Sequence, residues 1–111
     1  LEMARGAGLT ARLRREALPW LPGVQAFAAE GVVTGASGRN WASYGESVRL
    51  GGDVSDVERA LLTDPQTAGG LLVACDPQAA QAVLELFREQ GFADAAVVGD
   101  MVAGDALVRV D

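Results

Sequence analysis

Two short polar stretches carry most of the side chains in this sequence that could bind a charged ligand. The first, Gly35–Asn40 (GASGRN), places two glycines, a hydroxyl, a guanidinium and an amide side by side. Backbone N–H groups next to a guanidinium can cradle an anion. The stretch lacks the Gly-Lys-Ser/Thr ending of a P-loop, and an ordinary surface loop is the main alternative interpretation.

The second stretch, Asp64–Gly70 (DPQTAGG), leads directly into the apolar run Leu71–Cys75. Asp-Pro ends a preceding helix, because the residue before a proline is pushed out of the α region. The adjacent Gly69 and Gly70 permit positive φ or a close approach to the backbone. A short apolar run between breakers predicts a strand buried on both faces. A polar loop feeding such a strand is a common binding site, although a tight turn entering a core strand explains the same spacing.

The rest of the chain offers no complete catalytic apparatus. It has no histidine and one cysteine, which excludes a Ser-His-Asp triad, a histidine zinc site and an intrachain disulfide. Cys75 ends the apolar run, so we expect it to be buried and inert. Carboxylates could still bind magnesium, but no Asp/Glu pair has a spacing that demands it. We therefore expect neither a catalytic residue nor a metal ligand in this chain.

Charge and hydropathy narrow the class of protein further. The formal net charge is −6 and no lysine is present, which makes nucleic acid a poor candidate partner. No stretch approaches the roughly 20 apolar residues of a membrane span. Leu1–Arg15 is rich in arginine and lacks the apolar core of a signal peptide, so we expect a cytoplasmic protein. A length of 111 residues suits one domain, and Leu1–Ala7 reads as the tail of a helix cut short, so we expect a fragment.

Hydrophobic spacing and breaker residues predict which elements carry the two polar stretches. Ser55 and Glu58 form a capping box that starts a helix. Gly104-Asp105 suits a hairpin turn between Val102-Ala103 and Ala106-Leu107, after a strand that is interrupted at Gly99-Asp100. The predicted order is helix end, strand, helix, loop, helix, strand, helix, strand, strand, over residues 1–7, 9–14, 22–31, 35–40, 55–62, 71–75, 76–91, 95–98 and 106–110. This order predicts an α+β fold, a mixed β-sheet with helices packed on it.

Three segments resemble one known family. Asp64–Leu72 is similar to the Asp-Pro-Gln-Thr-Ser-Gly-Gly-Leu-Leu motif of selenide, water dikinase (selenophosphate synthetase), with Ala68 in place of the usual serine. Gly38-Arg39-Asn40 resembles the Gly-x-Arg-Asn of the same family, and Pro19–Gly31 resembles its Leu-Pro-x-Leu-Pro-Gly segment and the following helix. The resemblance covers nearly the whole chain and matches only the C-terminal domain of that enzyme.

The resemblance implies a layered α+β domain of the aminoimidazole ribonucleotide synthetase superfamily. The family converts ATP, selenide and water into selenophosphate, AMP and phosphate, and its N-terminal domain mainly holds the Mg²⁺ and ATP. By resemblance, residues 1–111 form one C-terminal domain that shapes and closes the active-site cleft. Its implied partners are its own N-terminal domain, a second subunit in a homodimer and small-molecule substrates, with no nucleic acid and no membrane.

The residues carried over from the family motifs are those expected to face the substrate or its phosphates. They are Gly38, Arg39, Asn40, Asp64, Gln66, Thr67, Gly69 and Gly70. Ala68 removes one hydroxyl, which puts the role of the usual serine in doubt here. We expect the isolated chain to be inactive, without cofactor. A standalone ligand-binding or interaction module on the same scaffold stays open as an alternative, as does another ATP-dependent member of the superfamily.

Overall fold

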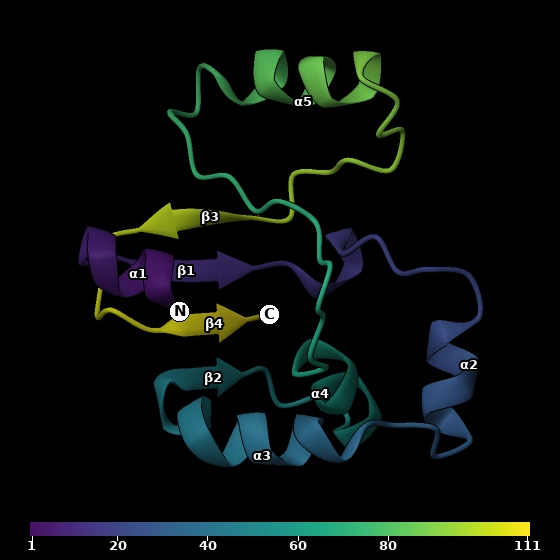
Figure 1. The fold of residues 1–111 in the computed structure, drawn as a ribbon. Coiled ribbons are helices and arrows are strands. Elements are labelled where there is room, and N and C mark those ends of the chain that lie inside the picture. Colours follow the sequence, from purple (N-terminus) through teal and green to yellow (C-terminus); the bar gives the residue numbers. More distant parts are fainter.

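The fold is a four-stranded mixed sheet with its helices at one side and around its rim, seen in a computed structural model that describes residues 1–111 (Figure 1). Its elements are α1 (Glu2–Ala7), β1 (Thr10–Leu13), a 3-10 helix (Arg15–Ala17), α2 (Val24–Ala29), α3 (Gly35–Tyr44), a second 3-10 helix (Gly45–Ser47), β2 (Val48–Leu50), α4 (Asp56–Leu62), α5 (Ala80–Glu89), β3 (Gly99–Val102) and β4 (Val108–Val110). The predicted α+β class is confirmed. No helix is long and apolar enough to cross a membrane.

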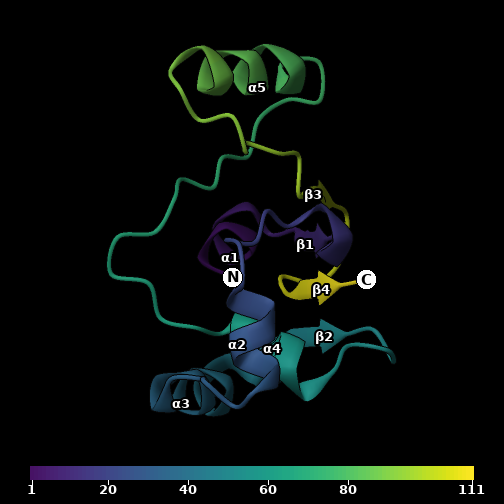
Figure 2. The same cartoon turned by 90° about the vertical axis from the view of Figure 1, so that its right-hand side faces the viewer.

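The strands are ordered β2-β4-β1-β3, with β2, β4 and β1 parallel and β3 antiparallel to β1. Figure 2 shows α1 and α3 on one side of the sheet, while the other face is bare. A partly open hollow of about 540 Å³ lies on the covered side. Its walls are the apolar side chains of the strands and residues of α1, α3 and α4, among them Leu13, Val110, Trp41 and Leu62.

Sequence reasoning placed several helix ends correctly. Gly8 ends α1 in the left-handed conformation, with φ of 63°. The Ser55–Glu58 capping box is present in full at the start of α4. Gly91 follows α5 with φ of 95°, and the Phe92 N–H donates to the Phe87 carbonyl at 3.0 Å, the contact of a Schellman-type cap.

The predicted hairpin between the last two strands is wrong. β1 lies between β3 and β4, pairing Arg12 with both Asp100 and Arg109. Strands separated by one neighbour lie about 10 Å apart, which a two-residue turn cannot span. The connection instead passes the start of β1, where the Thr10 hydroxyl donates to the Asp105 carbonyl at 2.6 Å.

The predicted loop at Gly35–Asn40 is also wrong, because these residues form the first turns of α3. Two glycines and a serine disfavour a helix locally, but tertiary contacts override weak propensity. Thr34 precedes the helix in an extended conformation, and the Ser37 N–H donates to its carbonyl at 3.1 Å. α3 then packs beside α4, so Ser37 is buried.

The predicted buried strand Leu71–Cys75 is not formed. The segment runs outside the sheet, and no backbone group of residues 65–75 makes a hydrogen bond to another backbone group. Leu71, Leu72 and Val73 are 82%, 61% and 50% exposed. Cys75 is exposed as well, against the expectation of a core thiol. The physical reason is that no strand pairs with the run, since β3 and β2 end the sheet.

Candidate functional site

The start of α3 and the residues that follow α4 lie against each other. The Thr34 hydroxyl donates to a carboxylate oxygen of Asp64 at 3.1 Å. The Asn40 side-chain amide donates to the Thr63 carbonyl at 2.8 Å. These two hydrogen bonds join the two polar stretches that sequence reasoning selected, which are some 24 residues apart in the chain.

A small hollow of about 220 Å³ opens between α3 and α4. The lining residues come from the start of α3 and one face of α4, and they are Val33, Thr34, Ser37, Gly38, Trp41, Asp56, Arg59, Ala60 and Thr63. The hydroxyls of Thr34 and Ser37 lie 3.2 Å apart at one side of it. The lining therefore combines three hydroxyl-bearing residues, an aromatic ring, one guanidinium and one carboxylate.

Arg59 is the one cationic side chain in the lining of this hollow. Its guanidinium lies 5.3 Å from the centre of the Trp41 ring, within cation–π range. It also forms an ion pair of 3.0 Å with Asp56, one turn earlier in α4. Arg59 is thus held in place by two neighbours and still reaches the hollow.

Arg39 occupies a different position from the other residues of α3. Its side chain is exposed and forms no ion pair, and its Nη1 lies near Gly35. Asp64 accepts a hydrogen bond from Thr34 and forms no ion pair with Arg39. The guanidinium is free to meet a ligand or another surface.

The remaining predicted site residues lie in the exposed segment after α4. Gln66, Thr67, Gly69 and Gly70 are all exposed, and none of them lines the hollow. Neither glycine has positive φ. A Cβ on Gly69 would come within 3.2 Å of the Gln66 side-chain oxygen, whereas one on Gly70 would meet nothing within 4 Å. The structure thus brings Gly38, Asn40 and Asp64 together and leaves these four apart.

Sequence reasoning missed three residues at this site, Thr34, Trp41 and Arg59, whereas Ser37 is the hydroxyl of the Gly35–Asn40 stretch. Thr34 and Ser37 have the spacing of a helix start, which a helical interpretation of the stretch would have revealed. The contact between Trp41 and Arg59 joins two helices, and no local pattern predicts it.

The three groups with shifted pKa values are Arg15 in the first 3-10 helix, Asp53 between β2 and α4, and Glu58 at the start of α4. A hydrogen bond from Arg15 lowers the pKa of the Asp53 carboxyl, and the same bond raises the pKa of Arg15. The backbone N–H and the hydroxyl of Ser55 lower the pKa of the Glu58 carboxyl. These contacts fix the chain into α4 and supply no proton-transfer group to the hollow.

No three acidic, histidine or cysteine side chains gather closely enough to hold a metal ion. We assign no chemical step to a metal on this chain.

Comparison with known proteins identifies the family of this chain and several similar proteins. The family model described as "AIR synthase related protein, C-terminal domain" matches residues 1–111. A protein of Burkholderia pseudomallei (strain K96243) named "Selenide, water dikinase" is 64% identical over 110 residues, which cover 99% of this chain and 31% of the relative. Proteins of the same name from Pseudomonas straminea and Rhizobium meliloti (strain 1021) are 60% and 51% identical, each over 99% of this chain.

The chain spans about a third of the length of these curated relatives. Its resemblance to selenide, water dikinase is confirmed at this level. The match over every residue shows that the chain belongs to the family of AIR synthase related protein C-terminal domains.

Proposed function

We propose that this chain is the C-terminal domain of a selenide, water dikinase, in which it shapes and closes the active-site cleft. The reaction is ATP, selenide and water giving selenophosphate, AMP and phosphate. The observation that carries the proposal is 64% identity to a relative of that name over 99% of this chain. The rest of the longer enzyme supplies the groups that hold Mg²⁺ and ATP.

The geometry of the polar stretches supports a role at a cleft. The bonds Thr34–Asp64 and Asn40–Thr63 hold the start of α3 and the start of the 64–70 segment as one unit. Because Asp64 is anchored, the exposed Gln66 and Thr67 project from a fixed base. A fixed base with exposed polar side chains is suited to contact a substrate bound by another domain.

Arg39 is the residue best placed to meet an anion. Its guanidinium is exposed and carries no ion pair, and a guanidinium can bind a phosphate or carboxylate through two parallel hydrogen bonds. We assign it to substrate or phosphate contact. The preceding Gly38 has open space around it, since an added Cβ there would meet nothing within 4 Å.

Exposed apolar surface supports the packing of this domain against more protein. Leu71, Leu72 and Val73 are exposed and their backbone groups are unpaired. On α5, Leu86 is 57% exposed. Apolar surface of this extent commonly marks an interface. The relatives are about three times as long as this chain, so their additional chain provides the partner surface in this proposal.

A domain exchange tests the proposal. The matched 110 residues of the Burkholderia pseudomallei protein are replaced by this chain, and selenide-dependent consumption of ATP is measured. We expect turnover within about tenfold of the parent, because the exchanged domain is 64% identical. The matched control is the parent protein truncated before the exchanged segment. A folded exchange protein with no more turnover than the truncated control would contradict the proposal.

A further inference from the structure

The bare face of the sheet carries a row of arginines that the proposed function does not use. In register, Arg49 of β2 lies beside Arg109 of β4, and Arg109 lies beside Arg12 of β1. Asp100 of β3 continues the row on the other side of Arg12. Residues paired in register project from the same face, so three guanidiniums and one carboxylate cross the four strands in a line.

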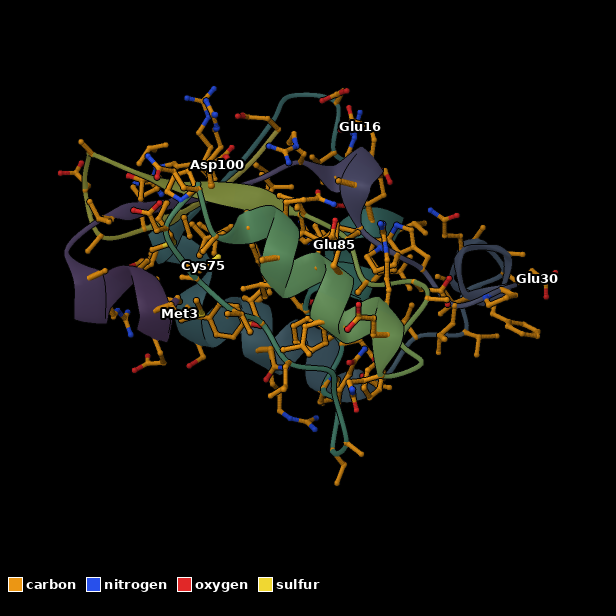
Figure 3. All side chains as sticks on the ribbon, turned by 90° about the horizontal axis from the view of Figure 1, so that it is seen from above. Met3, Glu16, Glu30, Cys75, Glu85 and Asp100 are labelled. Atoms are coloured by element: carbon orange, nitrogen blue, oxygen red, sulfur yellow. The ribbon has the colours of Figure 1, made fainter.

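This row points away from the helices. The alternate residues of the same strands, including Leu13, Leu50 and Val108, line the hollow on the side of α1 and α3. Figure 3 shows Asp100 on the side of the sheet opposite Met3 and Cys75. Arg12 and Arg109 are 46% and 59% exposed. No labelled helix lies over this face of the sheet (Figure 2).

The charges on this face do not balance. Arg12 and Arg14 share the carboxylate of Asp100, at 3.1 and 2.9 Å. Arg109 pairs with Asp111 at 2.7 Å. Arg49 donates only to backbone carbonyls, those of Glu46 and Val48. Four arginines therefore face two carboxylates, in a chain whose formal net charge is −6.

Like charges directly opposite each other destabilise a sheet. The row therefore costs stability, and Asp100 and Asp111 offset only part of that cost. A guanidinium has five N–H donors, and most donors of Arg49 and Arg109 remain available on this face.

The shape of the face selects the kind of partner. The two hollows described above lie among the helices and on the helix-covered side of the sheet, and a small molecule needs a concave site. A long nucleic acid is disfavoured by the acidic remainder of the chain. A charged, half-exposed strand face suits the polar surface of another protein.

We propose that the arginine row, defined as Arg12, Arg14, Arg49 and Arg109, docks an acidic helix of a separate protein. Neighbouring strands lie about 4.8 Å apart, and glutamates three or four positions apart on a helix lie about 5–6 Å apart. A helix lying across the strands places one carboxylate opposite each guanidinium. The contact is electrostatic, so it forms quickly and weakens with salt.

The test uses a fluorescent helical peptide with glutamates at every third or fourth position along one face, titrated into the 111-residue chain at low salt. The double variant Arg49→Gln/Arg109→Gln is expected to weaken binding about tenfold or more, because it removes charge-assisted donors. Arg49→Gln alone is compared with Arg88→Gln, on α5, which also removes one positive charge but lies away from the row. Arg88→Gln should change binding less than about twofold.

A gain-of-function variant separates this contact from loss of fold. Asp100→Asn removes the carboxylate that competes for Arg12 and Arg14, so it should tighten peptide binding several-fold. The proposal is overturned by no binding of the peptide, by equal weakening in Arg88→Gln, or by weaker binding in Asp100→Asn.

Equal affinity for a peptide with its glutamates scattered around the helix overturns the docking geometry. Tighter binding of inorganic tripolyphosphate overturns the partner. Loss of peptide binding in the domain-exchanged protein overturns docking of a separate protein, because the protein's own chain then covers the face.

Discussion

At the scale of single residues, the site depends on side chains that anchor others. Thr34 donates a hydrogen bond to Asp64, and Asn40 donates one to Thr63. Both side chains therefore position the start of the 64–70 segment and do not reach outward. Arg39 makes no such anchor and is exposed. This division predicts different consequences for substitutions that lie only a few residues apart.

Arg39→Lys is expected to lower kcat/KM of the domain-exchanged enzyme by about tenfold, which corresponds to about 1.4 kcal/mol. A lysine keeps the charge but cannot copy the paired hydrogen bonds of a guanidinium. Stability should change by no more than about 0.5 kcal/mol, because the side chain is exposed. Kinetics and thermal melting are measured together, and Arg88→Lys is the control. Unchanged kinetics in Arg39→Lys would refute the assignment of this residue to the site.

Glu58 provides a pH-dependent prediction. Its folded-state pKa is lowered below the usual value near 4.5 by the backbone N–H and hydroxyl of Ser55. A lowered pKa means that Glu58 contributes stability above pH 4.5, and that this contribution is lost as the pH falls through the folded-state pKa. Glu58→Gln should therefore be less stable than the parent near pH 7. The expected difference is only about 0.5 kcal/mol, because water reaches both Glu58 and Ser55.

The difference between Glu58→Gln and the parent should shrink towards zero below pH 4.5, as followed by urea unfolding across pH. Glu85→Gln, on the exposed face of α5, is the matched control. A stability difference that stayed constant with pH would show that the carboxylate charge is not responsible.

At the scale of elements, local sequence patterns predicted helix ends well but predicted strand pairing and helix contacts poorly. Ser55 with Glu58 and Gly91 with Phe92 act within a few residues, so the sequence displays them. The place of β1 between β3 and β4 depends on pairing partners far apart in the chain. Gly35–Asn40 misled because a helix start and a loop use the same residue types. The polar half of the candidate site was predictable, whereas the contact of Trp41 with Arg59 was not.

The pairing of β1 with β3 depends on a glycine. A Cβ on Gly99 would overlap the carbonyl oxygen of Arg12 on the neighbouring strand. Gly99→Ala is therefore expected to destabilise the chain by about 1–3 kcal/mol, since backbone must move. Gly6→Ala is the matched control, because it lies in α1 with nothing within 4 Å of the added Cβ. It should stabilise the chain by about 0.5–1 kcal/mol. Urea unfolding of both variants measures this, and a neutral Gly99→Ala would argue against the register.

At the scale of the whole molecule, the segment after α4 and α5 is the least integrated part of the chain. α5 stands apart from the sheet in both views (Figures 1 and 2). Leu71–Cys75 is apolar and exposed, which contradicts its sequence pattern as a core strand. The exposure of this apolar segment is what the proposed packing against further protein predicts.

Limited proteolysis tests whether Leu71–Cys75 is covered in the domain-exchanged protein. Chymotrypsin should cut the 111-residue chain first at Leu71 or Leu72, because the backbone around them is exposed and free of backbone hydrogen bonds. In the domain-exchanged protein the same bonds should be cut at least about tenfold more slowly, since protection follows the free energy of local opening. Phe92, also exposed, reports cleavage outside the segment. Equal cutting at Leu71 in both proteins would show that the segment is not covered.

The central claim, that this domain serves the selenide, water dikinase reaction, is tested most directly by the products of the domain-exchanged protein. ³¹P NMR of a reaction containing ATP, Mg²⁺ and selenide follows all phosphorus-containing products at once. The account predicts one selenophosphate and one phosphate for each AMP formed, with none of the three accumulating at this rate without selenide. ADP as the main nucleotide product, or AMP without selenophosphate, would contradict it.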